Sequence, residues 1–423
     1  MKRLSQLIVA TMLALSLAGG AIAQEDGEKK KQQTIGERVY KRLEQAHAAL
    51  GEKQYADVVT KLRQMEDMPL NDYERALVYQ TYGFLYAEQG QYGQALQYFE
   101  RCLALDALPD PAQQGMLFSL AGLYSAEGKY RKTIETMQRW LPNEPDPRPD
   151  AFIMLAAAHA ELNEYPQAKP WVEKAIAKSD KPKENWYQLL VAIQFELKQY
   201  SEAAQTLRRM VGYWPDKLTY WEMLSGAYQQ TGQDLQATSA MNLAYRKGLV
   251  GSQSKILNLV RMMLFIEDPF QAAQLLEKEM NAGVIEATQK NLELLLSAWT
   301  AAKEFDKAIA VIDRLAPMTG DGNYYLQKAQ LYAERTAWAE VIPAAEQAIA
   351  RGGLKKPGAP WLLKGMSEAE LGQLSKAIDS LTQAKNIGDR IIRAQADGWI
   401  QYVGEQQKAR VKIATSNDDA AAE

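Results

Sequence analysis

The chain has 423 residues, too many for one compact core of the usual size, so several domains or a repeat array are expected. Its composition, 47% hydrophobic and 24% charged, is that of a folded chain and excludes a wholly disordered one. The single cysteine excludes an intramolecular disulfide, the two histidines leave little for histidine-based chemistry, and a pI of about 5.8 argues against nucleic acid as a partner.

The first 23 residues have the pattern of a secretory signal peptide. Lys2 and Arg3 precede an apolar run from Leu7 to Ala18, and Ala21-Ile22-Ala23 is a small-residue cleavage sequence. The apolar run is shorter than the roughly 20 residues that a membrane-spanning helix needs. We therefore expect cleavage after Ala23, export to the periplasm and no stable membrane insertion afterwards. Residues 24–36 are polar and are expected to form a flexible leader.

One phrase then recurs along the chain: an aromatic or apolar residue, two mostly polar residues, a small residue, and an apolar residue four further on. It is clearest as Tyr92-Gly93-Gln94-Ala95 with Phe99. Successive copies start 33 to 38 residues apart, which is the signature of a repeat array. The copies start at Tyr55, Tyr92, Tyr130, Tyr165, Tyr200, Asp234, Phe270, Phe305, Trp338 and Leu374.

Each phrase follows a matching upstream half with its own helical spacing. Nine residues before the phrase there is usually a small residue, such as Gly83, Ala121 or Gly365. Bulky residues stand six and thirteen before it, as Tyr86 and Tyr79 do, so that one helical face is apolar. Glycine often lies between the halves and provides a helix stop. The pattern predicts hairpins of two helices, which bury their apolar faces only by stacking.

These residues resemble the tetratricopeptide repeat family over roughly residues 37–385. The resemblance implies an all-α fold, a right-handed α-solenoid of about ten helical hairpins. The match is poor at residues 255–280, where Arg261 replaces the small residue and Pro269 interrupts the turn, so the sequence leaves the shape of this unit open, with a kink as one alternative. Residues 386–410 are predicted to form a capping helix that covers the last hairpin, and residues 411–423 a disordered tail. Four apolar residues at helical spacing support the cap: Ile392, Ala396, Trp399 and Val403.

No catalytic, cofactor-binding or metal-binding signature is found in the sequence. It contains no zinc-protease helix motif, phosphate-binding glycine loop, dinucleotide fingerprint or nucleophile elbow. His159 stands where other repeats have an aromatic residue, so we interpret it as a ring packed between helices. Cys102 stands where other repeats have alanine, which indicates a buried, inert thiol. We therefore expect no enzyme activity and no cofactor.

In the tetratricopeptide repeat family, partners usually lie in a concave groove lined by the first helices of successive hairpins. Helical geometry predicts that seven residues of the N-terminal hairpins face it: Leu77, Gln80, Phe84, Glu88, Met116, Phe118 and Ile153. They would form an apolar stripe with a polar rim, suited to an extended or helical apolar segment. The alternative is that the curvature of the array buries these apolar residues. Some relatives clamp an acidic C-terminus with Lys and Asn, but the corresponding places here hold Gln80, Phe84, Phe118 and Gly122.

The sequence therefore predicts a non-catalytic periplasmic scaffold that binds protein partners, with its oligomeric state left open. Its layout is similar to that of the periplasmic repeat proteins that accompany TonB, ExbB and ExbD energy-transduction systems. One alternative is an assembly factor or chaperone for outer-membrane or secreted proteins. A more distant alternative is an accessory region of a cell-wall hydrolase or peptidase, which needs about 100 residues outside the array.

Overall fold

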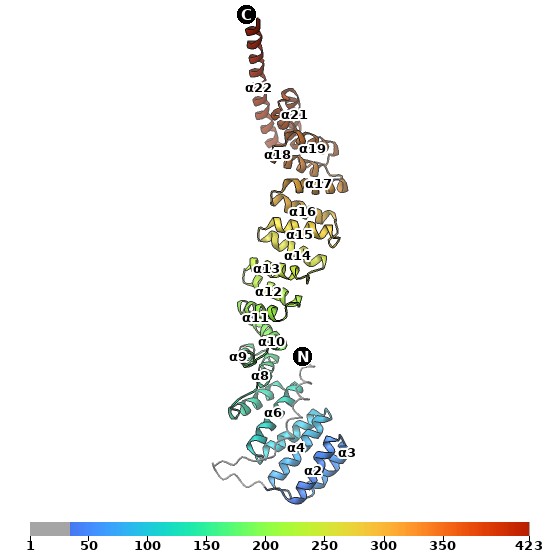
Figure 1. Cartoon of the computed structure of the whole chain (residues 1–423), viewed down its shortest axis with the longest axis vertical. Helices are drawn as coiled ribbons and strands as arrows, with labels where there is room; N and C mark the ends of the chain where they lie inside the picture. The colour runs from blue at the N-terminus through green and yellow to red at the C-terminus, as the bar shows by residue number, and fades with distance from the viewer. Residues whose placement is uncertain (1–33, 423) are drawn as a thin grey trace. The chain divides into compact units, whose positions relative to one another are not determined.

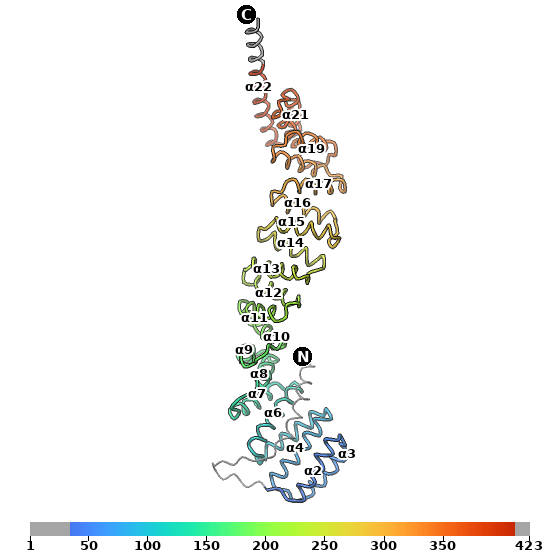
Figure 2. The backbone as a smooth tube through the Cα atoms, in the orientation of Figure 1, coloured from blue at the N-terminus to red at the C-terminus, as the bar shows by residue number. Residues whose placement is uncertain are grey.

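The computed structural model describes residues 34–422, with the side chains described through Arg410. The expected signal peptide and residues 24–33 of the expected leader lie outside these residues. The described chain consists of 21 α-helices and one short 3-10 helix, with no strand between residues 34 and 422. The expected all-α architecture of about ten hairpins and a C-terminal helix is confirmed (Figures 1 and 2).

The chain divides into two compact units with the boundary after Pro215, and each unit contains five hairpins. The first unit comprises α2 (Glu37–Gly51), α3 (Tyr55–Glu66), α4 (Asp72–Glu88), α5 (Tyr92–Ala104), α6 (Asp110–Ala126), α7 (Tyr130–Trp140), η1 (Leu141–Asn143), α8 (Pro149–Glu161), α9 (Tyr165–Ala177), α10 (Glu184–Glu196) and α11 (Tyr200–Tyr213).

The second unit ends with the capping helix. It comprises α12 (Leu218–Gln230), α13 (Asp234–Arg246), α14 (Gln253–Phe265), α15 (Pro269–Asn281), α16 (Gln289–Ala301), α17 (Phe305–Thr319), α18 (Gly322–Glu334), α19 (Trp338–Arg351), α20 (Gly358–Glu370), α21 (Leu374–Ile387) and α22 (Arg390–Ala422).

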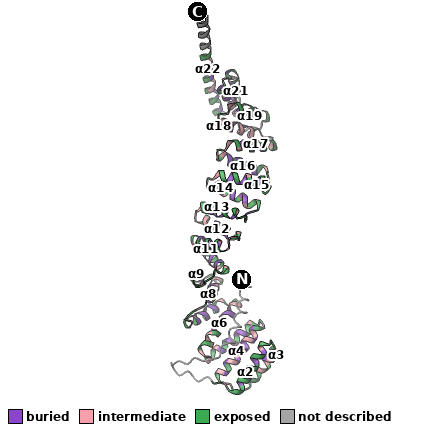
Figure 3. Ribbon diagram, viewed as in Figure 1, coloured by how far each residue is buried: buried purple, intermediate pink, exposed green. Residues whose placement is uncertain are grey.

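The small residues predicted from the repeat lie where the two helices of a hairpin cross. Ala46, Ala121, Ala156 and Ala329 are completely buried. At Gly83 the crossing is so close that a Cβ would lie 2.1 Å from Cε1 of Phe99. The second helices present aromatic and aliphatic partners, and within the first unit successive hairpins cover each other's apolar faces. Buried positions therefore run along the inside of each hairpin, with exposed ones outside (Figure 3).

The hairpin turns share one backbone conformation but not one residue type. Glycine occupies the left-handed position in four of them: Gly90, Gly128, Gly232 and Gly372. In the other six the same position is a non-glycine residue with φ between 54° and 59°: Lys53, Asn163, Lys198, Glu267, Lys303 and Thr336. A side chain with a Cβ is strained in this conformation. The repeat geometry therefore imposes the turn even where the local residue opposes it.

The hairpin at residues 255–280, whose shape the sequence left open, is regular: α14 and α15 are uninterrupted helices of 13 residues each. Helix α15 begins at Pro269, one residue before the predicted start at Phe270, and proline is well tolerated at the first helical position. Asp268 caps this helix by accepting a hydrogen bond from the backbone N–H of Gln271 at 3.4 Å. The one-residue shift places Val260, which is completely buried, at the crossing and leaves Arg261 exposed.

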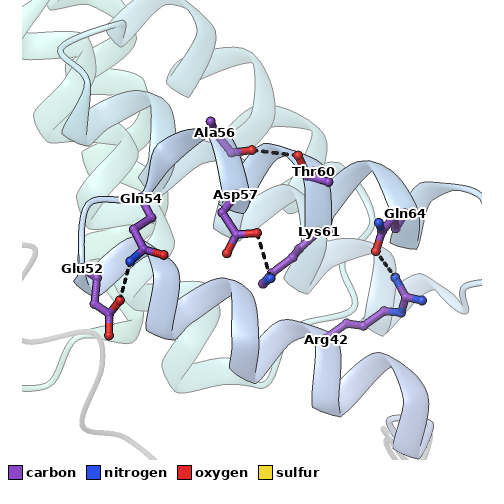
Figure 4. Close-up of polar contacts among 8 residues, drawn as sticks. All are labelled: Arg42, Glu52, Gln54, Ala56, Asp57, Thr60, Lys61 and Gln64. Atoms are coloured by element: carbon purple, nitrogen blue, oxygen red, sulfur yellow. Dashed lines mark hydrogen bonds and ion pairs between the residues drawn. The ribbon is translucent and has the colours of Figure 1, made fainter.

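The first hairpin carries a row of polar contacts on its outer surface (Figure 4). Lys61 pairs with Asp57 at 2.9 Å, the Gln54 amide donates to Glu52 at 2.7 Å, and Arg42 donates to Gln64. The side chains in these contacts are exposed or half-buried, so this face of the hairpin is solvated.

At the C-terminal end of the second unit, α22 covers the last hairpin, as predicted for a capping helix. Ile392, Ala396 and Val403 are buried against α20 and α21, and Trp399 packs against the same cluster. The helical backbone continues to Ala422, through the segment that was expected to be disordered from residue 411. Lys, Arg, Gln and Ala are frequent where the cap was expected to end, and all favour helix. No helix within residues 34–422 is both long and apolar enough to cross a membrane.

Candidate functional site

The predicted apolar stripe on the N-terminal hairpins is largely covered. Met116, Phe118 and Ile153 are only 2%, 6% and 5% exposed, so the prediction that they face an open groove is wrong. Phe118 packs on Trp140 with ring centroids 5.0 Å apart, and the Arg148 guanidinium lies 5.2 Å from its ring centroid. These side chains pack between neighbouring hairpins. This agrees with the alternative in which the curvature of the array buries them.

The remaining predicted residues lie at the edge of the same surface. Leu77 and Phe84 are half-buried and pack against the hairpin core, Phe84 edge-on to Phe99 at 5.3 Å. Gln80 is half-buried, and Glu88 is exposed, where it accepts a hydrogen bond from the Tyr55 hydroxyl at 3.3 Å. This region therefore presents a polar edge rather than the predicted apolar stripe.

A cavity of about 820 Å³ lies in the first unit beside Phe118, between α6, the end of α7 and the start of α8. Its lining combines the Asp110 and Glu144 carboxylates, the Arg148 guanidinium and the amides of Gln113, Gln114 and Asn143. The Oε1 atom of Gln114 is buried there and accepts no hydrogen bond from the described residues. The cavity is of the size of ligand sites, but its charges are of both signs and favour no single ligand.

In the second unit, hollows lie between the first helices of neighbouring hairpins. The one between α12 and α14 has a volume of about 380 Å³, and its lining is mixed, with Met241 and Met262 beside polar side chains. Lys255 and Glu222 pair across it at 2.5 Å, and Ser225, Gln229 and Asn258 line it. Its two opposite charges neutralise each other.

Another hollow of the second unit, about 870 Å³, lies between α20 and α22 with Gln330 of α18 at its side. Its walls are apolar. Helix α20 contributes Ala359, Leu362, Leu363 and Met366, and helix α22 contributes Ile391, Ile392, Gln395, Gly398, Trp399 and Tyr402. Ile391 is 66% and Tyr402 is 48% exposed. We call this hollow the cap groove.

The sequence reasoning did not find the cap groove, because it read α22 as a cover with one apolar face. A signal was present in the sequence. Ile391 and Tyr402 lie beside the buried series Ile392, Ala396 and Val403, so α22 has a second apolar stripe next to the first.

The titratable side chains singled out in the sequence serve the packing between hairpins. His159 is buried, as predicted, and its Nδ1 lies 2.8 Å from the Glu164 carboxylate. Glu164 also pairs with Arg131 at 2.5 Å, and these two partners lower the pKa of the Glu164 carboxyl. Cys102 is completely buried and its thiol donates to the carbonyl of Ala76 at 3.2 Å. Burial raises the pKa of this thiol to about 12, so the thiol is unreactive in the folded protein.

Within the described residues no three His, Cys, Asp or Glu side chains lie close enough together to hold a metal ion. The carboxylates in the hollows described above pair with lysines, cap helices or lie on mixed-charge surfaces. The arrangement is suited to holding other chains on helical surfaces.

Residues 70–107, which span α4 and α5, match the sequence model of the tetratricopeptide repeat family. No curated protein matches the chain. Among solved structures, a tetratricopeptide repeat protein from Parabacteroides merdae is 16% identical, covering 62% of this chain and 99% of its own, with a TM-score of 0.37.

Two further solved structures are similar over a shorter part of the chain. The MamA protein is 18% identical, covering 41% of this chain and 92% of its own, with a TM-score of 0.36. YrrB, described as a tetratricopeptide repeat protein with an unusual peptide-binding site, is 13% identical, covering 43% of this chain and 89% of its own, with a TM-score of 0.35.

Proposed function

We propose that the chain is a tetratricopeptide repeat protein that acts as a non-catalytic scaffold and holds protein partners within a periplasmic complex of the cell envelope. The observation that carries this proposal is the extent of the array. Ten hairpins and a cap account for almost the whole described chain, and their inter-helix surfaces are what a repeat protein offers to partners.

The cellular setting of the proposal rests on the sequence. The N-terminal pattern of Lys2-Arg3, an apolar run and Ala21-Ile22-Ala23 favours export and cleavage. The layout of a signal followed by hairpins is similar to that of repeat proteins that accompany TonB, ExbB and ExbD systems. We propose components of such an energy-transduction system as the partners.

Crosslinking in living cells tests both parts. A C-terminally tagged protein is recovered from the periplasmic fraction, its N-terminus is sequenced, and crosslinked proteins are identified by mass spectrometry. The proposal expects an N-terminus at Gln24 and a small set of stably bound envelope proteins that includes TonB-type or motor components. Recovery from the cytoplasm with Met1 retained contradicts the location. Transient crosslinks to many unfolded outer-membrane proteins contradict the scaffold and support an assembly factor.

A further inference from the structure

The two walls of the cap groove have the same helical periodicity. On α20 the lining residues Ala359, Leu362, Leu363 and Met366 follow the spacing i, i+3, i+4, i+7. On α22 they follow i, i+4, i+7, i+11 through Ile391, Gln395, Gly398 and Tyr402. Eleven residues of helix span about 17 Å, so the groove accommodates about three turns of a further helix.

Small residues keep the floor of the groove low at its centre. Gly398 faces the groove, and a Cβ at this residue would meet no atom within 4 Å. Glycine in a helix destabilises it by roughly 1 kcal/mol relative to alanine, and nothing within the described chain requires it here. Trp399 and Tyr402, whose rings pack edge-on at 5.5 Å, rise beside it. The surface is therefore a trough with an aromatic wall.

One end of the groove is basic. Gly388, just before α22, lies against Gly358 at the start of α20, so the two helices begin side by side. Lys356 and Asp389 line this end, and each has an exposed basic neighbour in sequence, Lys355 and Arg390. No carboxylate among the described residues pairs with these three basic side chains. The Asp389 carboxylate accepts the backbone N–H groups of Ile391 and Ile392 at 2.9 Å and so caps α22.

The other end of the groove carries charges of both signs. Beyond Met366 and Tyr402, the next exposed charged residues along the two helices are Glu370 and Glu405, and the Arg410 guanidinium donates a hydrogen bond to the carbonyl of Gly372 at 3.2 Å just after the end of α20. The macrodipoles of α20 and α22 have their positive ends at the basic end of the groove. An apolar trough with one basic end fits an amphipathic helix that carries acidic residues at one of its own ends.

We propose that the cap groove is the docking site for an amphipathic helix of a protein partner, about three turns long, with an acidic C-terminal end that lies at Lys356 and Arg390. This inference rests on the proposed scaffold function and specifies the segment that such a partner presents. The bound helix runs antiparallel to α20 and α22, so that its negative C-terminal end meets their positive N-terminal ends. Its apolar face covers Met366, Ile391 and Tyr402.

The test uses the full chain without its first 23 residues and two fluorescent 15-residue peptides. Both peptides are amphipathic Leu/Ala helices; one ends in three glutamates and a free carboxylate, and the other ends in three lysines and an amide. Fluorescence anisotropy is measured for the unmodified chain, for Ile391→Ser/Tyr402→Ser, and for Lys356→Glu/Arg390→Glu. The matched controls are Leu235→Ser/Leu243→Ser, at exposed leucines on α13, and Lys376→Glu on α21.

The unmodified chain is expected to bind the acidic peptide at least tenfold tighter than the basic one. The apolar double variant loses at least tenfold in affinity for the acidic peptide, because the exposed anchors of the groove are removed. The charge-reversed variant prefers the basic peptide, and both controls bind as the unmodified chain does. Circular dichroism melts of all variants show that each is folded.

Equal affinities for the two peptides, or an equal loss in the control variants, overturn the proposal. A dimer of the unmodified chain that Ile391→Ser/Tyr402→Ser dissolves also overturns it, because a second copy then occupies the groove. Crosslinking in cells separates this inference from the scaffold proposal. Partners captured equally by the unmodified chain and the groove variant contradict the groove alone. Peptide binding that follows the variants, with no protein captured in cells, supports the groove and contradicts the scaffold.

Discussion

Gly83→Ala tests how closely the two helices of a hairpin must approach. A methyl group at this residue would lie 2.1 Å from Cε1 and 2.2 Å from Cδ1 of Phe99. Phe99 is 1% exposed and packs edge-on against Phe84, so its ring has no space into which to move. Overpacking of this kind destabilises a protein by about 1–3 kcal/mol, and we expect the upper end of that range.

The matched control is Gly93→Ala, one helix further on, where a Cβ would meet nothing within 4 Å. Both substitutions replace a helical glycine by alanine, which favours the helix by up to roughly 1 kcal/mol, so a lower stability of Gly83→Ala reports the steric overlap. We expect Gly83→Ala to be about 3 kcal/mol less stable than Gly93→Ala in urea unfolding followed by circular dichroism.

The labelling rate of Cys102 gives a local version of the same measurement. Because repeat arrays need not unfold in one step, a probe within the affected hairpin is more direct than a global midpoint. Cys102 lies on the same helix as Phe99 and is completely buried, so it reacts only when this hairpin opens. A difference of 3 kcal/mol predicts labelling about a hundredfold faster in Gly83→Ala than in Gly93→Ala. Equal rates and equal midpoints would refute the packing argument.

Three further predictions follow from single sites. Lys198→Gly is expected to raise the stability of the α10–α11 hairpin by about 1 kcal/mol in urea unfolding, because Lys198 has φ of 56°; an unchanged midpoint would show that its turn is unstrained. Cys102 in the unmodified chain is expected to react with a thiol reagent far more slowly than a peptide cysteine at pH 8, because burial raises its pKa to about 12; a peptide-like rate would contradict the burial. Hydrogen bonds from Tyr124 and Lys132 lower the pKa of Glu100 below its ordinary 4.5, so their stabilisation is present above about pH 4.5 and is lost as the pH falls through the lowered value. The melting temperature of Glu100→Gln should therefore converge with that of the unmodified chain in acid, and a constant difference would show that the carboxylate is not responsible.

The repeat phrase predicted the helical hairpins well because it marks contacts within a hairpin. Small residues such as Gly83 and aromatic residues such as Tyr92 at the start of the phrase recur for one local reason, the close crossing of two helices. In the structure they lie within the hairpins as predicted. The phrase failed by one residue at Phe270, because Pro269 suits the first position of a helix as well as the turn before it.

The surface was harder to predict because exposure depends on contacts between hairpins. Met116, Phe118 and Ile153 lie on a helical face that is open in an isolated hairpin, and the neighbouring hairpins cover it. Ile391 and Tyr402 show the reverse case. Their helix has no hairpin after it in the described chain, so a stripe that would be covered inside the array remains exposed. The sequence pattern of a single hairpin therefore predicts neither the burial of the first three residues nor the exposure of the last two.

The most direct test of the account is site-specific photo-crosslinking in living cells, with a photoreactive amino acid at Tyr402 in the cap groove or at Leu243 on the outer surface of α13. The account predicts that the Tyr402 derivative forms one dominant crosslink to an envelope protein, that the attachment lies in an amphipathic helix with an acidic end, and that Lys356→Glu/Arg390→Glu abolishes it. Crosslinks of equal yield and identity from both positions, or none from Tyr402, would contradict it.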